Sequence, residues 1–209
     1  MSWKERLLRN SRLYVLVDND LCSGQLIKIA RQAISAGADI IQLRFKNGFT
    51  IDKLRLAQII RKLSLGKSLF IVNDHIDIAL AVGADGVHLG QDDLPIEIAR
   101  KILGRPMLIG ISCHSLKQAK EAEHRGADYI GVGPVFLTSA KPKLHPIGPK
   151  VLAQIKKNIR IPFFAIGGIK QNNLKQILDC GVKKVVIGSA VCKSKTVNKT
   201  IQEFKKLLK

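Results

Sequence analysis

The chain has 209 residues, 46% of them apolar, and a formal net charge of +19. This length holds one domain with a full core or at most two small ones, and the apolar fraction predicts a folded chain. No apolar run approaches the roughly 18 residues of a membrane span, so we expect no membrane partner. The charge favours anionic partners such as phosphorylated metabolites. Only 5% of residues are aromatic, and they do not interleave with basic residues, so nucleic acid is a minor hypothesis.

The N-terminal stretch MSWKERLLRNSRLYVLVD lacks the apolar core and the cleavage site of a signal peptide. It also carries Glu5 and Asp18, whereas transit peptides are poor in acidic residues. We therefore expect a cytoplasmic protein. The four cysteines are scattered without a CxxC pair or a Cys/His cluster, so we interpret them as reduced thiols that pack in the core.

Short β-rich runs alternate with amphipathic segments along the whole chain. After a short helix in residues 1–10, we predict strands at residues 12–18, 39–45, 69–74, 86–90, 107–112, 129–136, 162–168 and 185–190. Stretches such as SAGAD and HRGAD place a glycine where a helix ends before the next strand. Repeated strand–helix units without a linker predict an α/β fold, a (β/α)₈ TIM barrel forming a single domain over residues 1–209. An open doubly wound sheet is the alternative, but no GxGxxG motif follows the first strand.

Two successive predicted strands end in acid, in LFIVND and in GVHLGQDD. In a parallel barrel, the carboxyl ends of the strands meet at the mouth, where active sites lie. Asp74 and Asp93 therefore face one point there, and two carboxylates with room for waters and a phosphate predict a magnesium site. Asp92 is instead a candidate N-cap of the following helix.

The second predicted strand ends in QLRFK. Alternation turns Gln42, Arg44 and Lys46 into the barrel and leaves Phe45 facing the helices. Two cations in a barrel interior need an anion, so a bound polyanion is expected near them. An internal salt bridge to Asp74 is the alternative.

The remaining strand ends predict a second anion site. The long loop GPVFLTSAKPKLHPIGPK after the sixth strand offers hydroxyls and a cation at Thr138, Ser139 and Lys141. The seventh and eighth strands end in AIGGI and VIGSA, where backbone N–H groups can approach a phosphate. The candidates there are Gly167, Gly168, Gly188 and Ser189. Two anion sites at one mouth predict two phosphorylated small-molecule substrates.

These motifs occur together and in order along essentially the whole chain: LYVLVD, QLRFK, VND, ALAVGADGVHLGQDDLP, ADYIGVGPVF, AIGGI and VIGSA. In this arrangement the chain resembles the thiamine-phosphate synthase family. The resemblance implies an enzyme, a transferase that joins 4-amino-2-methyl-5-(diphosphomethyl)pyrimidine to a thiazole phosphate and releases pyrophosphate. The thiazole phosphate could be 4-methyl-5-(2-phosphoethyl)thiazole or its carboxylated form.

The family likeness also assigns roles residue by residue. It implies that Asp74 and Asp93 hold Mg²⁺ as the cofactor. It implies that the pyrimidine diphosphate is held by Gln42, Arg44, Lys46, Asn73, Ser112 and Lys141. The thiazole phosphate would be held by Thr138, Ser139, Ala140, Gly168, Gly188 and Ser189. Among these, Arg44, Lys46, Lys141 and Ser112 are the expected catalytic residues, because no obvious Ser–His or Cys–His nucleophile pair is seen and an ionising mechanism needs none.

Three positions depart from the family pattern. Phe45 stands where Glu is usual, Gly188 where a bulkier apolar residue is common, and Ala140 where a hydroxyl residue is expected. The Ala140 change removes one hydrogen-bond donor, which costs roughly 1.5–3 kcal/mol when the partner is charged.

Two other functions remain open. A thiazole tautomerase of the related barrel family would use a histidine base, and His114 in SCHSL could serve. A non-catalytic barrel that binds a phosphometabolite or RNA would explain the charge, and it predicts RNA binding with steep salt dependence and no metal requirement. The chain could also form a homo-oligomer.

Overall fold

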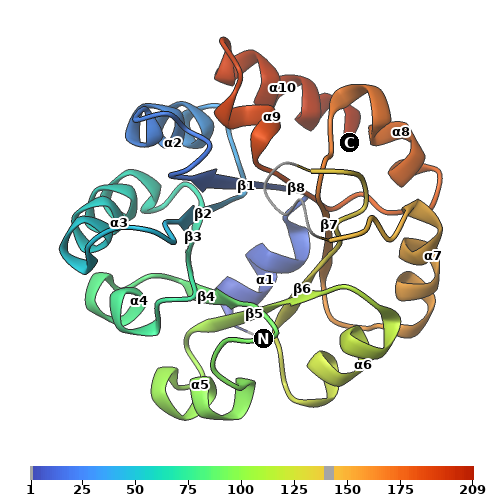
Figure 1. Cartoon of the computed structure of the whole chain (residues 1–209), viewed down its shortest axis with the longest axis horizontal. Helices are drawn as coiled ribbons and strands as arrows, with labels where there is room; N and C mark the ends of the chain where they lie inside the picture. Colours follow the sequence, from blue (N-terminus) through green and yellow to red (C-terminus); the bar gives the residue numbers. More distant parts are fainter. Residues whose placement is uncertain (1, 139–143) are drawn as a thin grey trace.

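The computed structural model describes residues 2–138 and 144–209, and it contains a closed parallel barrel with the strand order β1-β2-β3-β4-β5-β6-β7-β8. The strands are β1 (Leu13–Asp18), β2 (Ile40–Arg44), β3 (Leu69–Asn73), β4 (Gly86–Leu89), β5 (Leu108–Cys113), β6 (Tyr129–Val132), β7 (Phe163–Ile166) and β8 (Val185–Ile187). Helices form an outer ring around them (Figure 1). The predicted (β/α)₈ barrel is therefore confirmed.

Helices alternate with the strands along the chain, as predicted. They are α1 (Trp3–Asn10), α2 (Leu26–Ser35), α3 (Thr50–Ser64), α4 (Ile76–Val82), α5 (Ile96–Leu103), α6 (Leu116–His124), α7 (Pro149–Asn158), α8 (Gln171–Leu178), α9 (Ser189–Cys192) and α10 (Val197–Leu207). None of the helices in the described part of the chain is long and apolar enough to cross a membrane.

Alternation along the strands builds two separate cores. In β1, Val15 and Val17 face outward and pack against the helices, whereas Tyr14 faces inward. The inner core is filled by large side chains of several strands, namely Tyr14, Ile40, Leu69, Ile71, Leu108, Tyr129, Phe164 and Val186. The barrel is thus packed below its mouth, and ligands have access only to the carboxyl ends of the strands.

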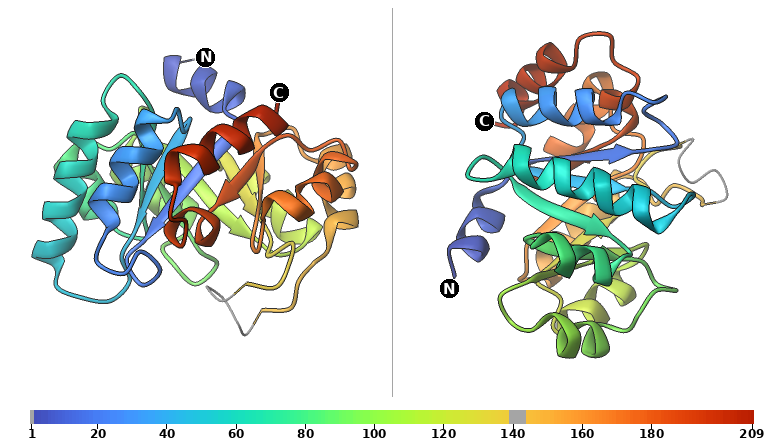
Figure 2. Two further views of the ribbon diagram at one scale, coloured as in Figure 1. Left: turned by 90° about the horizontal axis from the view of Figure 1, so that it is seen from above. Right: turned by 90° about the vertical axis from the view of Figure 1, so that its left-hand side faces the viewer.

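Helix α1 lies at the opposite end of the barrel from the mouth (Figure 2). It begins with a capping box, in which Ser2 accepts from the Glu5 backbone N–H and Glu5 accepts from the Ser2 N–H. Its Leu8 is 2% exposed and packs into the inner core, beside the tyrosines and Phe164. The helix predicted in residues 1–10 therefore closes the amino-terminal end of the barrel.

The strand boundaries differ most from the prediction at two strands, and by one or two residues at the others. The sixth strand was expected to reach residue 136 but ends at Val132, because Pro134 has no backbone N–H to donate to a ladder. The eighth was expected to reach residue 190 but ends at Ile187, and α9 begins two residues later. The cysteines are free, as predicted, and the Cys22 thiol donates to Cys192.

Candidate active site

Two adjoining pockets open at the mouth of the barrel. The first, here called the carboxylate pocket, lies over β2 to β4 and is lined by Gln42, Lys46, Asn73, Asp74, Gly90 and Asp93 among others. The second, the glycine pocket, lies over β6 to β8 and is lined by Thr138, Gly167, Gly168, Gly188 and Ser189 among others. The two anion sites predicted from the strand ends thus correspond to two pockets.

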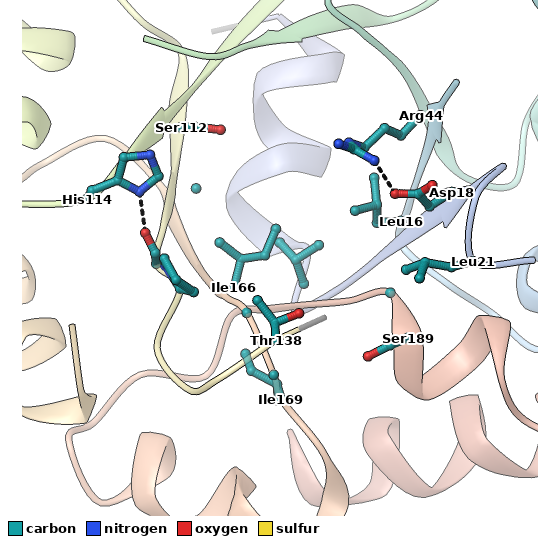
Figure 3. A pocket seen from close by; sticks show the side chains of 17 residues that line it. Leu16, Asp18, Leu21, Arg44, Ser112, His114, Thr138, Ile166, Ile169 and Ser189 are labelled. Atoms are coloured by element: carbon teal, nitrogen blue, oxygen red, sulfur yellow. Dashed lines mark hydrogen bonds and ion pairs between the residues drawn. The ribbon is translucent and has the colours of Figure 1, made fainter. Parts of the chain in front are cut away.

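The two pockets share one wall. Leu16, Arg44, Ser112, Gly131, Ile166 and Val186 line both of them. Arg44 and Ser112 are the polar side chains in this wall, so each can contact a ligand in either pocket. In Figure 3, Ser112 lies between His114 and Arg44, while Thr138 and Ser189 lie on the opposite side.

Asp74 and Asp93 are brought together in the carboxylate pocket. Asp74 follows β3 directly and has a left-handed backbone with a φ of 61°. Burial and a hydrogen bond shared with Asp93 raise the pKa of the Asp74 carboxyl to about 6, although Lys46 opposes the shift. Asp93 also accepts a hydrogen bond of 2.6 Å from the Gly90 N–H, and Lys46 Nζ lies 3.8 Å from Asp74 Oδ2.

These two carboxylates fit a divalent cation. In residues 2–138 and 144–209, no group of three or more His, Cys, Asp or Glu side chains suited to a metal is found. Mg²⁺ does not need such a group, because it usually keeps several waters and binds one or two carboxylates together with substrate phosphates. Two carboxylates held close enough to share a proton are a suitable donor pair. The metal assignment therefore stays a prediction that the site geometry suits.

The inward orientation predicted for the second strand is confirmed. Gln42 is buried and donates to Asn73 Oδ1 at 2.9 Å, which fixes both amides at the pocket floor. Lys46 reaches the rim, where its side chain is half exposed. Phe45 packs against the outer core, so the residue that replaces the usual Glu lies away from the pockets.

Asp18 is a site residue that the sequence analysis missed. It is the register partner of Arg44 across β1 and β2, and its carboxylate pairs with the Arg44 guanidinium. The Asp18 side chain is 2% exposed, so the pair is largely removed from water. The signal was present in LYVLVD, a third strand that ends in acid. The alternative salt bridge to Asp74 is formed by Lys46, at 3.8 Å, whereas Arg44 pairs with Asp18 instead.

Ser112 contacts a histidine, in a pair that is not obvious from the sequence. His88 on β4 places Nε2 3.0 Å from Ser112 Oγ on β5. These residues are 24 positions apart in the chain, so their contact depends on barrel closure and not on a local motif. His114 lies in the glycine pocket, where its Nδ1 donates to the Gly133 carbonyl (Figure 3).

The glycine pocket has a backbone that only glycine suits. Gly168 has a φ of 64°, and a Cβ there would lie 2.3 Å from the Leu137 carbonyl oxygen. The chain after β7 therefore lies directly against the segment that leads to Thr138. Of the predicted site residues, Ser139, Ala140 and Lys141 lie outside the described residues.

The comparisons with known proteins show the family. The sequence profile of the thiamine monophosphate synthase family matches residues 13–191. The chain belongs to the thiamine monophosphate synthase family. It is 43% identical over 204 residues to thiamine-phosphate synthase from Halalkalibacterium halodurans, covering 96% of this chain and 97% of that protein. It is 39% identical over 204 residues to thiamine-phosphate synthase from Methanosarcina barkeri, covering 97% and 93%.

A solved structure gives the same result. The thiamine phosphate pyrophosphorylase from Pyrococcus furiosus superimposes with a TM-score of 0.88 at 39% identity, covering 97% of both chains. The chain is therefore a thiamine-phosphate synthase-type enzyme, a transferase, as its resemblance to that family indicated.

Proposed function

We propose that the enzyme joins 4-amino-2-methyl-5-(diphosphomethyl)pyrimidine to a thiazole phosphate and releases pyrophosphate and thiamine phosphate. The observation that carries this proposal is the pair of adjoining pockets with Arg44 and Ser112 in their common wall. Two substrates bound in the two pockets would meet at this wall. Holding two reactants in contact supplies much of the acceleration in a bimolecular reaction.

The carboxylate pocket would take the pyrimidine diphosphate. Gln42 and Asn73 present fixed amides at its floor, and Arg44 and Lys46 present cations at its side and rim. A diphosphate leaves more readily when its growing negative charge is stabilised by groups already in place. Arg44 is held in place by Asp18, so it would not need to reorganise as the bond breaks. Lys141 is expected to add a further cation from the loop after β6.

Mg²⁺ would be held by Asp74 and Asp93, and when bound it would neutralise charge on the leaving diphosphate. Burial and the neighbouring Asp93 carboxyl raise the pKa of Asp74 to about 6 when no cation is bound. Binding of a dication would favour the ionised form of both groups.

The glycine pocket would take the thiazole phosphate. Its backbone after β7 and β8 and the hydroxyls of Thr138 and Ser189 suit a phosphate. Ser139 and Ala140 are expected to belong to the same site. The thiazole nitrogen would then attack the pyrimidine methylene after the diphosphate has departed, in a dissociative substitution. Either the thiazole phosphate or its carboxylated form satisfies this arrangement.

Pyrophosphate release by the purified protein, with both substrates and Mg²⁺, tests the proposal. An Asp93→Ala variant should lose activity by on the order of 100-fold, since a group that stabilises developing charge is removed. Asp92→Ala is the matched control, because Asp92 is adjacent and exposed but does not line the carboxylate pocket, and it should keep wild-type activity. Equal loss in both variants, or release without Mg²⁺, would contradict the metal assignment.

A thiazole tautomerase is the alternative, and the position of His114 favours testing it. His114 Nδ1 donates to a carbonyl, which leaves Nε2 as an acceptor in the glycine pocket. Isomerisation of a carboxythiazole phosphate without any pyrophosphate release from the substrate pair, together with loss of that isomerisation in His114→Gln, would establish this alternative. The synthase predicts the opposite pattern. Whether the enzyme works as a monomer or a homo-oligomer stays a prediction for solution measurement.

A further inference from the structure

A chain of hydrogen bonds runs through the barrel interior and ends at Ser112. The Tyr14 hydroxyl lies 3.1 Å from the Tyr129 hydroxyl, Tyr129 lies 3.3 Å from His88 Nδ1, and His88 Nε2 lies 3.0 Å from Ser112 Oγ. Each residue comes from a different strand, β1, β6, β4 and β5 in that order. The chain thus connects the packed inner core with the wall shared by the two pockets.

The strands provide space for this chain at two glycines. Gly110 lies between His88 and Tyr129 in the strand register, and a Cβ on Gly110 would lie 2.1 Å from Tyr129 Cζ. Gly131 is the register partner of Ser112, and a Cβ there would lie 3.3 Å from His88 Cε1. Neither glycine has a positive φ, so the turn geometry does not require them. Each glycine instead leaves room for a ring, Gly110 for that of Tyr129 and Gly131 for that of His88.

The buried end of the chain determines its direction. Tyr14 is 1% exposed, and among the described residues the hydrogen-bond partner recorded for its hydroxyl is Tyr129. If Tyr14 donates to Tyr129, then Tyr129 donates to His88 Nδ1, and His88 Nε2–H donates to Ser112 Oγ. If the direction is reversed, no acceptor for the Tyr14 proton is recorded among the described residues, and a donor that is 1% exposed is unfavourable without an acceptor. Burial raises the pKa of both tyrosines, so each keeps its proton.

We propose that Tyr14, Tyr129 and His88 are positioning residues that orient the Ser112 hydroxyl as a hydrogen-bond donor to the diphosphate of the pyrimidine substrate. In this direction His88 Nε2 carries a proton and cannot accept one from Ser112. The Ser–His contact is therefore not a nucleophile with its base. The Ser112 proton is left free to point from the wall into the carboxylate pocket. The identity of its acceptor, the diphosphate, rests on the proposed function.

The tautomer of His88 tests the direction without any turnover. NMR of the protein labelled with ¹⁵N-histidine resolves protonated from unprotonated ring nitrogens, and His88→Gln identifies the His88 signals among the five histidines. We expect Nε2 to be protonated and Nδ1 to be unprotonated in the substrate-free wild type. A proton on Nδ1 with a bare Nε2 would overturn the proposal, whether or not the protein makes thiamine phosphate.

A double-mutant cycle tests the link to catalysis. Tyr129→Phe should lower kcat about fivefold to tenfold in the wild type, with little change in either KM. It should have no further effect in a Ser112→Ala background, because the oriented hydroxyl is already gone. Additive losses in the two backgrounds would show that Tyr129 acts only on the fold, and the proposal would fail although the synthase activity stands.

Leu8→Ala is the packing control. Leu8 is 2% exposed and belongs to the same inner core as the two tyrosines, but it lines neither pocket and takes no part in the hydrogen bonds. This variant should lose stability while kcat stays near that of the wild type. A loss of kcat in Leu8→Ala equal to that in Tyr129→Phe would assign the effect to packing and overturn the proposal.

Discussion

Asp74 is a half-buried carboxyl whose negative charge destabilises the fold at neutral pH when no cation is bound. Burial and Asp93 raise its pKa from 3.8 to about 6, so the folded state binds this proton more tightly than the unfolded state does. The free energy of unfolding should therefore fall as the pH rises from about 4 to about 6, and stay lowered above that range. A cation bound by both carboxylates, as proposed, would offset this cost.

Replacing Asp74 with Asn should stabilise the metal-free protein at high pH. Asn accepts the left-handed backbone at this position, and it removes the charge that faces Asp93. In urea denaturation with a chelator, we expect a gain of roughly 1–2 kcal/mol near pH 8 and almost none near pH 4. A gain that is equal at the two pH values would show that ionisation of Asp74 is not its cause.

Single residues of the site could be predicted where the information is local. Alternation along one strand was enough to turn Gln42, Arg44 and Lys46 into the barrel. The Arg44 partner on β1 and the His88 contact with Ser112 could not be assigned, because each joins two strands whose register is set only when the barrel closes. The roles of these residues toward a ligand stay predictions.

At the scale of elements, the strand glycines have a measurable role. A Cβ on Gly110 would lie 2.1 Å from Tyr129 Cζ and 2.5 Å from both Cε atoms, so β5 or the Tyr129 ring would have to move. Gly110→Ala should therefore cost about 1–3 kcal/mol in the free energy of unfolding, as overpacking does. Urea denaturation followed by circular dichroism measures this cost.

Gly188→Ala is the matched control for that change. Gly188 also borders the barrel interior, but a Cβ there meets no atom closer than 3.6 Å. Its effect should stay within about 0.5 kcal/mol. A cost as large as that of Gly110→Ala would mean that loss of glycine itself, and not the Tyr129 contact, destabilises the strands.

The existence and order of the elements followed from the sequence, and their ends did so less well. Repeated strand–helix units with glycine before the next strand determined the barrel. Apolar residues continue past Val132 to Phe136, so the hydrophobic pattern alone extends β6 too far. The missing N–H of Pro134 interrupts the regular ladder, although the Val135 and Phe136 N–H groups still donate to Ile166 and Gly167. The loop that follows cannot be assigned from periodicity, since it has none.

At the scale of the whole molecule, stability depends on how α1 completes the inner core. Leu8 is 2% exposed, whereas Leu7 beside it is 47% exposed. Leu8→Ala should lower the free energy of unfolding by about 2–5 kcal/mol through the cavity it leaves. Leu7→Ala should change it by less than about 0.5 kcal/mol. Similar losses in both variants would contradict the packing of Leu8 into the barrel.

Because α1 occupies the far end of the barrel, substrates and products have to enter and leave through the mouth. The carboxylate pocket extends down to Tyr14 and Phe164, and it shares its wall with the glycine pocket. With the substrates placed as proposed, pyrophosphate and thiamine phosphate would leave through the same opening at the barrel mouth. Both products would then have to leave before the next pair of substrates binds. Excess pyrophosphate would occupy the carboxylate pocket in place of the next pyrimidine diphosphate, so it would act as a competitive product inhibitor.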